Sequence, residues 1–101
     1  MSAENLRAFA RGKPCYLRLV GCTHDTEQTV LAHIRRGNIA GVGQKPCDAA
    51  AFPCCDHCHG IYDGRYKAHG YTRIELDAEA LRALCQWLAY LWREEILVAV
   101  L

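Results

Sequence analysis

The pattern of apolar and polar positions predicts short elements over most of the chain and one long helix near its end. Residues 4–12 are predicted to form a short basic helix that ends at Gly12. Loose alternation over 15–19 predicts a strand. Residues 29–35 favour a second strand, because they contain β-branched side chains and alternate with a period of two. A helix stays open as an alternative there, since few helix-breaking residues occur between 27 and 36.

The middle of the chain predicts a loop, a short helical turn and a compact cysteine-rich segment. Three glycines between positions 37 and 43 predict an irregular loop over 38–45. Residues 46–51 then predict a helical turn that Pro53 ends. The segment 55–63 follows as a tight turn that continues into a helix.

An amphipathic helix is predicted over about 77–96. Asp77 is its expected N-cap, and Glu79 lies in its first turn, where a carboxylate interacts favourably with the helix dipole. Its expected apolar face consists of Leu81, Leu84, Cys85, Leu88, Leu91 and Trp92. On this face, Cys85 is expected to be an ordinary core residue.

The end of this helix carries more apolar residues than one face requires. Trp87, Tyr90 and Trp92 are followed by the apolar segment 96–101. A homodimer through the C-terminal helix is therefore a hypothesis. Charged residues at 93–95 interrupt the apolar stretch, so no transmembrane helix is expected.

Length and composition predict one small domain over residues 1–101, with its core over 13–66. The chain has 101 residues and a formal net charge of +1, so any surface that binds nucleic acid must be a local patch. Its seven cysteines are an odd number, which fits poorly with a closed set of disulfides. Residues 1–10 are polar and predict no signal peptide, so a cytoplasmic protein with metal-binding thiols is expected.

The most informative motif is the run CCDHCH over residues 54–59. Cys55 and Cys58 have the C-x-x-C spacing of a zinc knuckle, and Cys15 and Cys22 can complete a closed site of four thiolates. A structural Zn2+ would help to stabilise so small a core. Alternatively, the two early cysteines are simply small buried apolar residues. The substitutes as ligands are Cys47, Cys54 and His24.

A second possible metal site follows directly. His59 and Asp63 lie four residues apart, so they would share one face of a helix. An imidazole and a carboxylate can hold Mg2+, Mn2+ or Zn2+ with open positions, and Asp48 can supply a third ligand. Such an ion stabilises negative charge on the oxygen that leaves a phosphodiester. The alternatives are two solvated helix residues, or His59 in place of a thiolate at the zinc.

His33 follows apolar residues in the predicted strand and has two interpretations. It is a half-buried strand histidine, or a general base that takes a proton from water and directs the resulting nucleophile at phosphorus. The basic residues near these groups are Arg35, Arg36, Lys45 and Arg65. They would bind phosphates or form an ordinary solvated face. Arg35 and Arg65 are the favoured pair because they flank His33 and Asp63.

The order of these motifs resembles the HNH, or ββα-metal, nuclease superfamily, and within it the small prophage-encoded YbcO-like nucleases. The matching stretches are 5–12 with Cys15, 29–35, 45–46 with Asp48, and 55–65. Together they cover roughly residues 4–65. The C-terminal helix matches only in general character.

The resemblance implies an α+β fold: a zinc-stapled treble clef with a ββα core, followed by the amphipathic helix. It implies that His33 is the general base. Asp48 falls near the family's middle asparagine, which orients this base or reaches the metal. His59 and Asp63 fall at the ligands of the catalytic ion, and Arg35 or Arg65 would assist.

Three positions depart from the family pattern. Ala32 stands where many members carry an acidic metal ligand, which implies a weaker catalytic ion site. Asp48 lies two residues farther from the knuckle than the usual asparagine, and Cys47 replaces the second proline of a Lys-Pro-Pro-Asp motif.

The sequence therefore predicts a phage- or prophage-encoded, metal-dependent endonuclease that hydrolyses DNA. Superfamily chemistry implies 5′-phosphate and 3′-hydroxyl products. The alternative is a non-catalytic zinc module that binds nucleic acid or a protein, which keeps the cysteines but needs neither His33 nor Asp63. A thiol redox protein is a third class, disfavoured because no cysteine pair lies in a thioredoxin-like setting.

Overall fold

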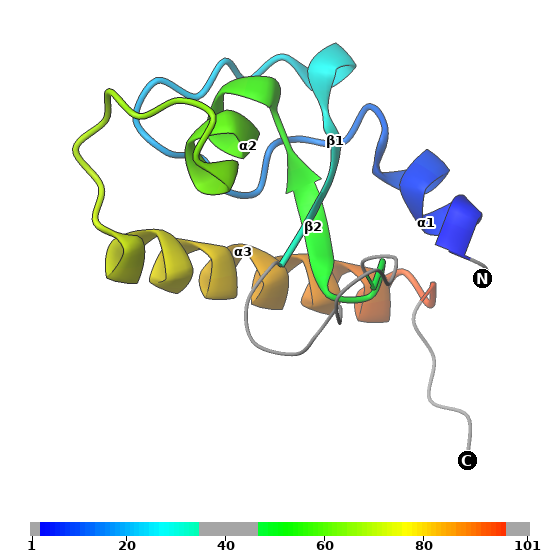
Figure 1. Ribbon diagram of the computed structural model, residues 1–101. Coiled ribbons are helices and arrows are strands. Elements are labelled where there is room, and N and C mark those ends of the chain that lie inside the picture. Colours follow the sequence, from blue (N-terminus) through cyan, green and yellow to red (C-terminus); the bar gives the residue numbers. More distant parts are fainter. Residues whose placement is uncertain (1–2, 35–46, 97–101) are drawn as a thin grey trace.

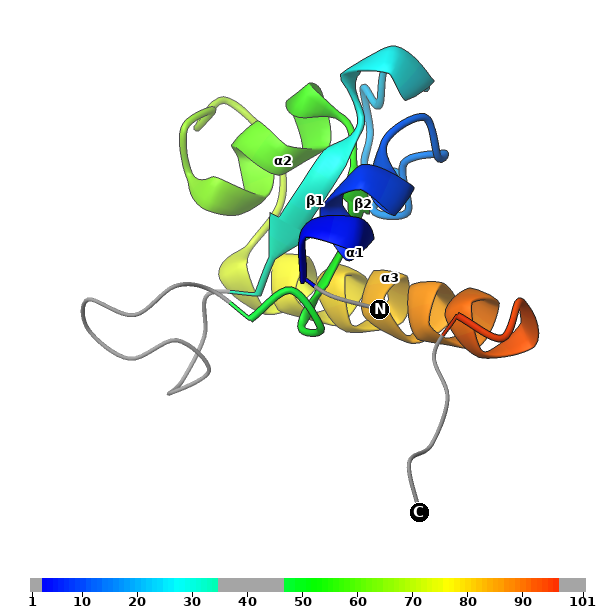
Figure 2. The ribbon, with the colours of Figure 1, turned by 90° about the vertical axis from the view of Figure 1, so that its right-hand side faces the viewer.

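The computed structural model describes residues 3–34 and 47–96 and has the α+β architecture that the sequence predicts. The elements in order are α1 (Ala3–Ala10), the 3-10 turn η1 (Thr26–Gln28), β1 (Val30–His33), β2 (Ala51–Cys54), α2 (Asp56–Asp63) and α3 (Arg73–Arg93). Strands β1 and β2 form a hairpin above α3, and α1 and α2 lie on either side of it (Figures 1 and 2). Within the described ranges, no helix combines the length and apolar character that a membrane span needs.

The strand predicted over 29–35 is confirmed as β1, whereas the helical turn predicted over 46–51 is largely wrong. That segment includes a tight turn, in which the Ala50 amide donates to the Cys47 carbonyl at 3.0 Å, but Ala51 already begins β2. The two strands are antiparallel, with Val30 opposite Cys54 and His33 opposite Ala51.

Pro53 lies inside β2 instead of ending an element before it. Its carbonyl accepts a hydrogen bond from the Tyr16 amide at 2.9 Å, on the side of β2 away from β1. The nitrogen of the same residue points to that side too, because N–H and C=O groups of one strand residue share an edge. No hydrogen bond between the strands is lost, so the proline is tolerated.

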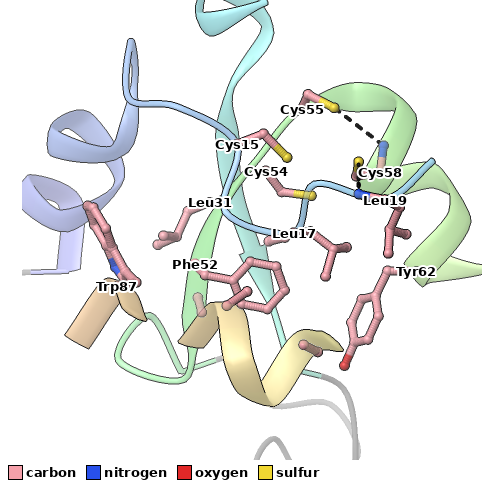
Figure 3. Packing of buried hydrophobic residues seen from close by; sticks show 14 of the residues in the cluster. Cys15, Leu17, Leu19, Leu31, Phe52, Cys54, Cys55, Cys58, Tyr62 and Trp87 are labelled. Atoms are coloured by element: carbon pink, nitrogen blue, oxygen red, sulfur yellow. Dashed lines mark hydrogen bonds between the residues drawn. The ribbon is translucent and has the colours of Figure 1, made fainter. Parts of the chain in front are cut away.

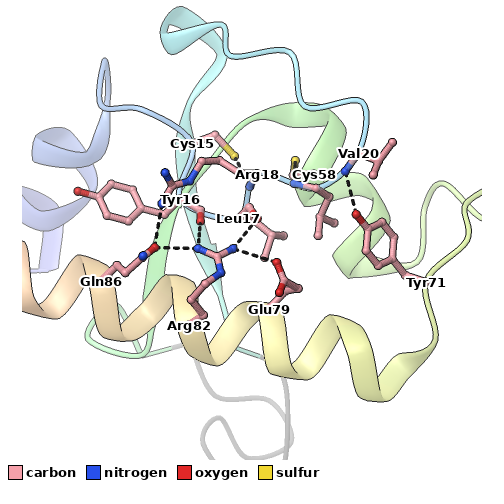
Figure 4. A network of polar contacts seen from close by, with 11 residues as sticks. Cys15, Tyr16, Leu17, Arg18, Val20, Cys58, Tyr71, Glu79, Arg82 and Gln86 are labelled. Atoms are coloured by element: carbon pink, nitrogen blue, oxygen red, sulfur yellow. Dashed lines mark hydrogen bonds and ion pairs between the residues drawn. The ribbon is translucent and has the colours of Figure 1, made fainter.

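The strand predicted over 15–19 is wrong, because this segment is irregular. Arg18 has a φ of +48°, which interrupts an extended path. The backbone is held by a side chain of α3 in place of a strand partner. The Arg82 guanidinium donates to the Tyr16 carbonyl at 3.0 Å and to the Leu17 carbonyl at 2.7 Å (Figure 4).

The tight turn and helix predicted over 55–63 are confirmed. Cys55 is the N-cap of α2, and its sulfur accepts a hydrogen bond from the Cys58 amide. Helix α2 ends at Gly64, which has a φ of +84°. This left-handed conformation is the usual reason for glycine after the last turn of a helix.

The predicted N-cap of the last helix, Asp77, is wrong by five residues. The N-cap of α3 is Thr72, whose hydroxyl accepts from the Glu75 amide at 3.1 Å, while the Glu75 carboxylate accepts from the Thr72 amide at 2.8 Å. This reciprocal pair is a capping box and satisfies two backbone donors at the helix end. Its T-x-x-E signature is present in the sequence.

The predicted apolar face of α3 is rotated from the observed one. The buried residues are Leu76, Ala80, Ala83, Trp87 and Leu91. Leu81 is 61% exposed, and Cys85 is exposed rather than part of the core. The small side chains of Ala80 and Ala83 let α3 lie close to β2, and this close packing selects the buried face.

The side chain of Trp87 is buried inside the molecule. It is 1% exposed and packs against Phe9 and Tyr16, with ring centroids 5.9 and 5.4 Å away. At the other end of the core, Phe52 meets Tyr62 edge-on, and the cysteine sulfurs gather apart from Trp87 (Figure 3). The exposed large apolar side chains on α3 are Ile74, Leu81 and Trp92. A homodimer through α3 stays a prediction.

Candidate functional site

The structure brings together the four cysteines that the sequence selects for zinc. Cys15 and Cys22 come from the irregular segment after α1, and Cys55 and Cys58 come from the start of α2. Their four sulfurs all lie within 4.8 Å of one another, and those of Cys22 and Cys55 are 3.7 Å apart. Tetrahedral zinc with Zn–S bonds of about 2.3 Å places sulfurs about 3.8 Å apart, whereas a disulfide needs about 2.05 Å. The cluster therefore fits a metal ion and not a disulfide.

Backbone amides point at three of these sulfurs. The Arg18 amide donates to Cys15 at 3.5 Å, the Leu19 amide to Cys58 at 3.4 Å, and the Cys58 amide to Cys55 at 3.5 Å (Figures 3 and 4). Hydrogen bonds to a thiolate favour its charged form. Burial acts in the opposite direction and raises the pKa of Cys22 to about 11. Four half-buried to buried thiols thus need a cation before all can ionise, which is the chemistry of a closed metal site.

The substitute ligands lie outside this cluster. Cys54, at the end of β2, is buried, and hydrogen bonding to Cys15 and Cys58 raises its pKa well above the ordinary value. Correspondingly, the hydrogen bond from Cys54 lowers the pKa of Cys15. Cys54 is therefore a protonated thiol that donates to the cluster. Cys47 is exposed, and the Nδ1 atom of the exposed His24 lies 3.8 Å from the Cys22 sulfur.

The loop that carries Cys22 is docked on α2 through a glycine. Gly21 has a φ of +88°, and a Cβ atom there would lie 2.6 Å from Nε2 of His57. The same Nε2 is 3.0 Å from the Val20 carbonyl oxygen. Backbone and imidazole approach so closely that no side chain fits between them.

Gly21→Ala is expected to lower the free energy of unfolding by about 2–4 kcal/mol, the sum of left-handed backbone strain and a steric clash. Chemical denaturation measures this. Gly12→Ala is the matched control, because Gly12 has a φ of +78° and nothing within 4 Å of its Cβ position. Equal losses in the two variants would show that contact with His57 plays no part.

A second group of polar side chains joins β1, the turn before β2 and α1. His33 ends β1, and its Nε2 lies 2.6 Å from Oδ1 of Asp48. The side chains of His33 and Asp48 are 14% and 4% exposed. The Nε atom of Arg7 lies 3.0 and 3.2 Å from the two Asp48 oxygens. Pairing of His33 with Ala51 across the hairpin brings the two partners together.

Asp48 is ionised in this arrangement. Burial alone raises the pKa of its carboxyl group, but hydrogen bonds from His33 and Arg7 outweigh burial and lower it. A carboxylate only accepts, so Nε2 of His33 carries a proton, and whenever the ring is neutral Nδ1 carries the lone pair. The arrangement fixes an imidazole in one orientation and one tautomer. The sequence singled out His33 and Asp48 but not Arg7, whose only signal was its place in a basic helix.

His59 and Asp63 share one face of α2, as expected. Nε2 of His59 and Oδ2 of Asp63 are 2.9 Å apart, and each side chain is 21% exposed. Adjacent ligands of an octahedral ion with bonds of about 2.1 Å lie about 3 Å apart, so the two atoms fit one ion. Among residues 3–34 and 47–96, however, no further His, Cys, Asp or Glu completes a group of three with them. Asp48, expected as a third ligand, contacts His33 and Arg7 instead.

Of the four predicted phosphate-binding residues, one lies in a described part of the chain. Arg65 is half exposed and lies 3.7 Å from Asp56. Arg35, Arg36 and Lys45 fall outside the described residues, so their roles stay predictions.

Comparison with known proteins agrees with this arrangement of motifs. The family described as "Putative nuclease YbcO" matches residues 4–90. The chain belongs to the YbcO family. Two curated relatives, "Putative nuclease YbcO" of Escherichia coli (strain K12) and "Putative nuclease ybcO" of Enterobacteria phage 82, are each 44% identical over 62 residues. The match spans 60% of this chain and 65% of each relative's length.

A solved structure has a fold similar to that of this chain. The structure of "a putative bacteriophage protein" from Escherichia coli str. K-12 substr. MG1655 is 30% identical to this chain, with a TM-score of 0.73. The likeness covers 90% of this chain and all of that one. The similarity therefore extends beyond the cysteine cluster, whose ligands span 15–58, to most of α3.

Proposed function

We propose that this chain is a metal-dependent endonuclease of the HNH type that hydrolyses phosphodiester bonds in DNA. The observation that carries the proposal is the His33–Asp48 pair. A nearly buried, ionised carboxylate lies 2.6 Å from the imidazole. In this YbcO-family chain the pair lies at the end of the hairpin opposite to Cys54, which precedes the cysteine cluster. A structural role alone does not require a carboxylate and an arginine to fix one ring in one tautomer.

In the proposed reaction, Nδ1 of His33 takes a proton from water. The oxygen of that water attacks phosphorus, and the bond from phosphorus to the 3′ oxygen breaks, which leaves a 5′-phosphate and a 3′-hydroxyl. Asp48 holds the ring and stabilises the imidazolium that forms. Bound by His59 and Asp63, Mg2+, Mn2+ or Zn2+ would stabilise negative charge on the leaving oxygen.

The remaining assignments follow from the same proposal. The four cysteines hold a structural Zn2+, which ties the segment after α1 to α2. Arg65 binds phosphate together with Arg35, Arg36 and Lys45, and Arg35 assists at the transition state. A relative in Enterobacteria phage 82 supports a phage or prophage origin. The proposed place of action is the cytoplasm of the bacterial host.

Arg7 acts in this mechanism as a positioning residue for Asp48. Arg7→Gln is expected to lower kcat about tenfold with KM near the wild-type value, because a displaced base loses catalytic alignment but not substrate affinity. Steady-state cleavage of a labelled oligonucleotide separates the two constants. The control is Arg11→Gln, which removes an exposed arginine just after α1. A rise in KM at unchanged kcat would instead place Arg7 on the substrate.

A second candidate function is a non-catalytic zinc module that binds nucleic acid. One observation favours it: Ala32 is fully buried, at the position where the family resemblance implies an acidic ligand. Cleavage of supercoiled plasmid with Mg2+, Mn2+, Ni2+ or Zn2+ decides between the two. Cutting that depends on metal and on His33 supports the nuclease, and its absence with every metal supports the module.

A further inference from the structure

Two guanidinium groups converge on one neutral oxygen between α3 and the segment after α1. Arg18 Nη2 donates to Oε1 of Gln86 at 2.8 Å, and Arg82 Nη1 donates to the same oxygen at 2.7 Å (Figure 4). Two positive charges that share a neutral acceptor repel each other, and the amide oxygen does not neutralise either of them. The charge at this place is therefore only partly compensated.

The charge of Arg82 is partly neutralised by a carboxylate. Its Nη2 lies 3.1 Å from the Glu79 carboxylate. In the described parts of the chain, no carboxylate forms an ion pair with Arg18 or with Arg93, which is exposed at the end of α3. Arg18 and Arg93 thus carry the surplus positive charge.

These two arginines line a pocket. The pocket encloses about 380 Å³ and lies beside Cys15, a ligand of the proposed zinc. Its other lining residues are Pro14, Tyr16, Gln86 and Ala89. The acidic residues that follow Arg93 in the sequence do not line it.

The pocket combines positive charge with a partly buried aromatic surface. Burial and the nearby Tyr90 raise the pKa of Tyr16, and the charges of Arg18 and Arg93 act against them, so both guanidiniums are within electrostatic reach of the phenol. The Arg18 guanidinium also lies 6.0 Å from the centre of the Tyr16 ring. Guanidinium forks match the oxygens of a phosphate, and aromatic or apolar surfaces accept a sugar or base.

Contacts within the chain hold part of the pocket wall. The Arg82 guanidinium donates hydrogen bonds to the Tyr16 and Leu17 carbonyls. Arg18 donates to the side chain of Gln86. The Tyr16 ring packs edge-on against the buried Trp87. Binding would therefore order few groups on this part of the wall, and the exposed Arg93 would be the main side chain to be ordered.

We propose that this pocket binds a phosphodiester of a nucleic-acid strand, with the phosphate between Arg18 and Arg93 and the adjoining sugar or base against Tyr16. This inference rests on the proposed function, since it takes DNA as the ligand. It adds a phosphate contact that none of the sequence-predicted residues supplies.

The test is DNA binding by the zinc-loaded protein, measured by fluorescence anisotropy of a labelled duplex without added catalytic metal. Arg18→Gln and Arg93→Gln are each expected to weaken binding several-fold, together about tenfold, and each to reduce the slope of log affinity against log salt by about one. Lys67→Gln is the matched control: it removes one exposed charge from the loop before α3, at the far end of that helix from Arg93 (Figure 1). Zinc content and circular dichroism verify that each variant is folded.

The outcomes separate this inference from the nuclease proposal. Weaker binding and a smaller salt slope in the pocket variants alone support the phosphate site, even if no metal gives cleavage. Unchanged affinity and slope overturn it, even if cleavage depends on His33. In a parallel experiment, inorganic phosphate or an acidic peptide is titrated while the nuclear magnetic resonance signals of arginine side chains are followed. If either probe shifts the Arg18 signal while the pocket variants bind DNA normally, the inference is also overturned.

Discussion

Replacing His33 by alanine is expected to slow DNA cleavage by about 10²- to 10⁴-fold, the usual contribution of a general base. The structural reason is that Asp48 fixes the tautomer of this ring, so that no other group replaces the lone pair of Nδ1. Plasmid nicking at saturating Mg2+ or Mn2+ measures the rate. DNA affinity is expected to stay near the wild-type value, because an imidazole that acts on water adds little to ground-state binding.

Stability must be followed in the same variant, because His33 also partners a buried carboxylate. Removing the imidazole leaves Asp48 with Arg7, so the carboxylate keeps one charged partner at 3.0 Å. His69→Ala, in the loop before α3, is the control for loss of a half-buried histidine. If His33→Ala cuts as fast as the wild type in a nuclease-free preparation, His33 is not the base and the zinc module becomes the better interpretation.

The local patterns that predicted structure well are those confined to one element. The β-branched, alternating residues over 29–35 predicted β1, although its partner β2 lies 18–24 positions away. The C-x-x-C motif predicted the start of α2 because the Cys55 sulfur accepts from the Cys58 amide three residues on. The capping box at Thr72 was equally local and was missed because Asp77, a good N-cap residue, came closer to the apolar stripe.

Other features depend on tertiary contacts and had no local signal. Strand β2 forms around Pro53 only because the Tyr16 amide uses the far edge of that strand. The buried face of α3 is chosen by Ala80 and Ala83, which allow close approach to β2, and hydropathy favours larger residues instead. A pattern of hydrophobicity records which residues prefer burial, but not which neighbours leave room for them.

The candidate site likewise has some residues that the sequence predicted and others that depend on tertiary contacts. Cys55 and Cys58 were predictable from spacing alone, whereas the unusual six-residue gap between Cys15 and Cys22 works because Arg18 adopts a left-handed conformation that turns the chain back. The contact of Arg7 with Asp48 spans 41 positions in the sequence. Neither the turn nor the contact has a sequence motif, so only the folded chain reveals them.

Cys58→Ser is expected to abolish stable metal binding and to unfold the chain at ordinary temperature. The apparent binding free energy of a structural zinc is about 10–16 kcal/mol, which is comparable to the whole stability of about 5–15 kcal/mol typical of small domains. Cys58 is fully buried, and its sulfur also accepts a hydrogen bond from the Leu19 amide, so its loss detaches the segment after α1 as well. Zinc content by atomic spectroscopy and far-ultraviolet circular dichroism measure the two effects together.

Two cysteine variants make this prediction specific. Cys85→Ser changes an exposed thiol on α3 and is expected to leave zinc content and stability unchanged. Cys54→Ser is expected to keep the zinc, because Cys54 is a hydrogen-bond donor to the cluster and its hydroxyl replacement still donates. Retention of a folded, metal-free chain in Cys58→Ser would mean that the sulfurs are core side chains, whereas loss of zinc in Cys54→Ser would make Cys54 a ligand. Because the cluster joins the segment after α1 to the start of α2, loss of a bound metal is also expected to disturb the helix that carries His59 and Asp63.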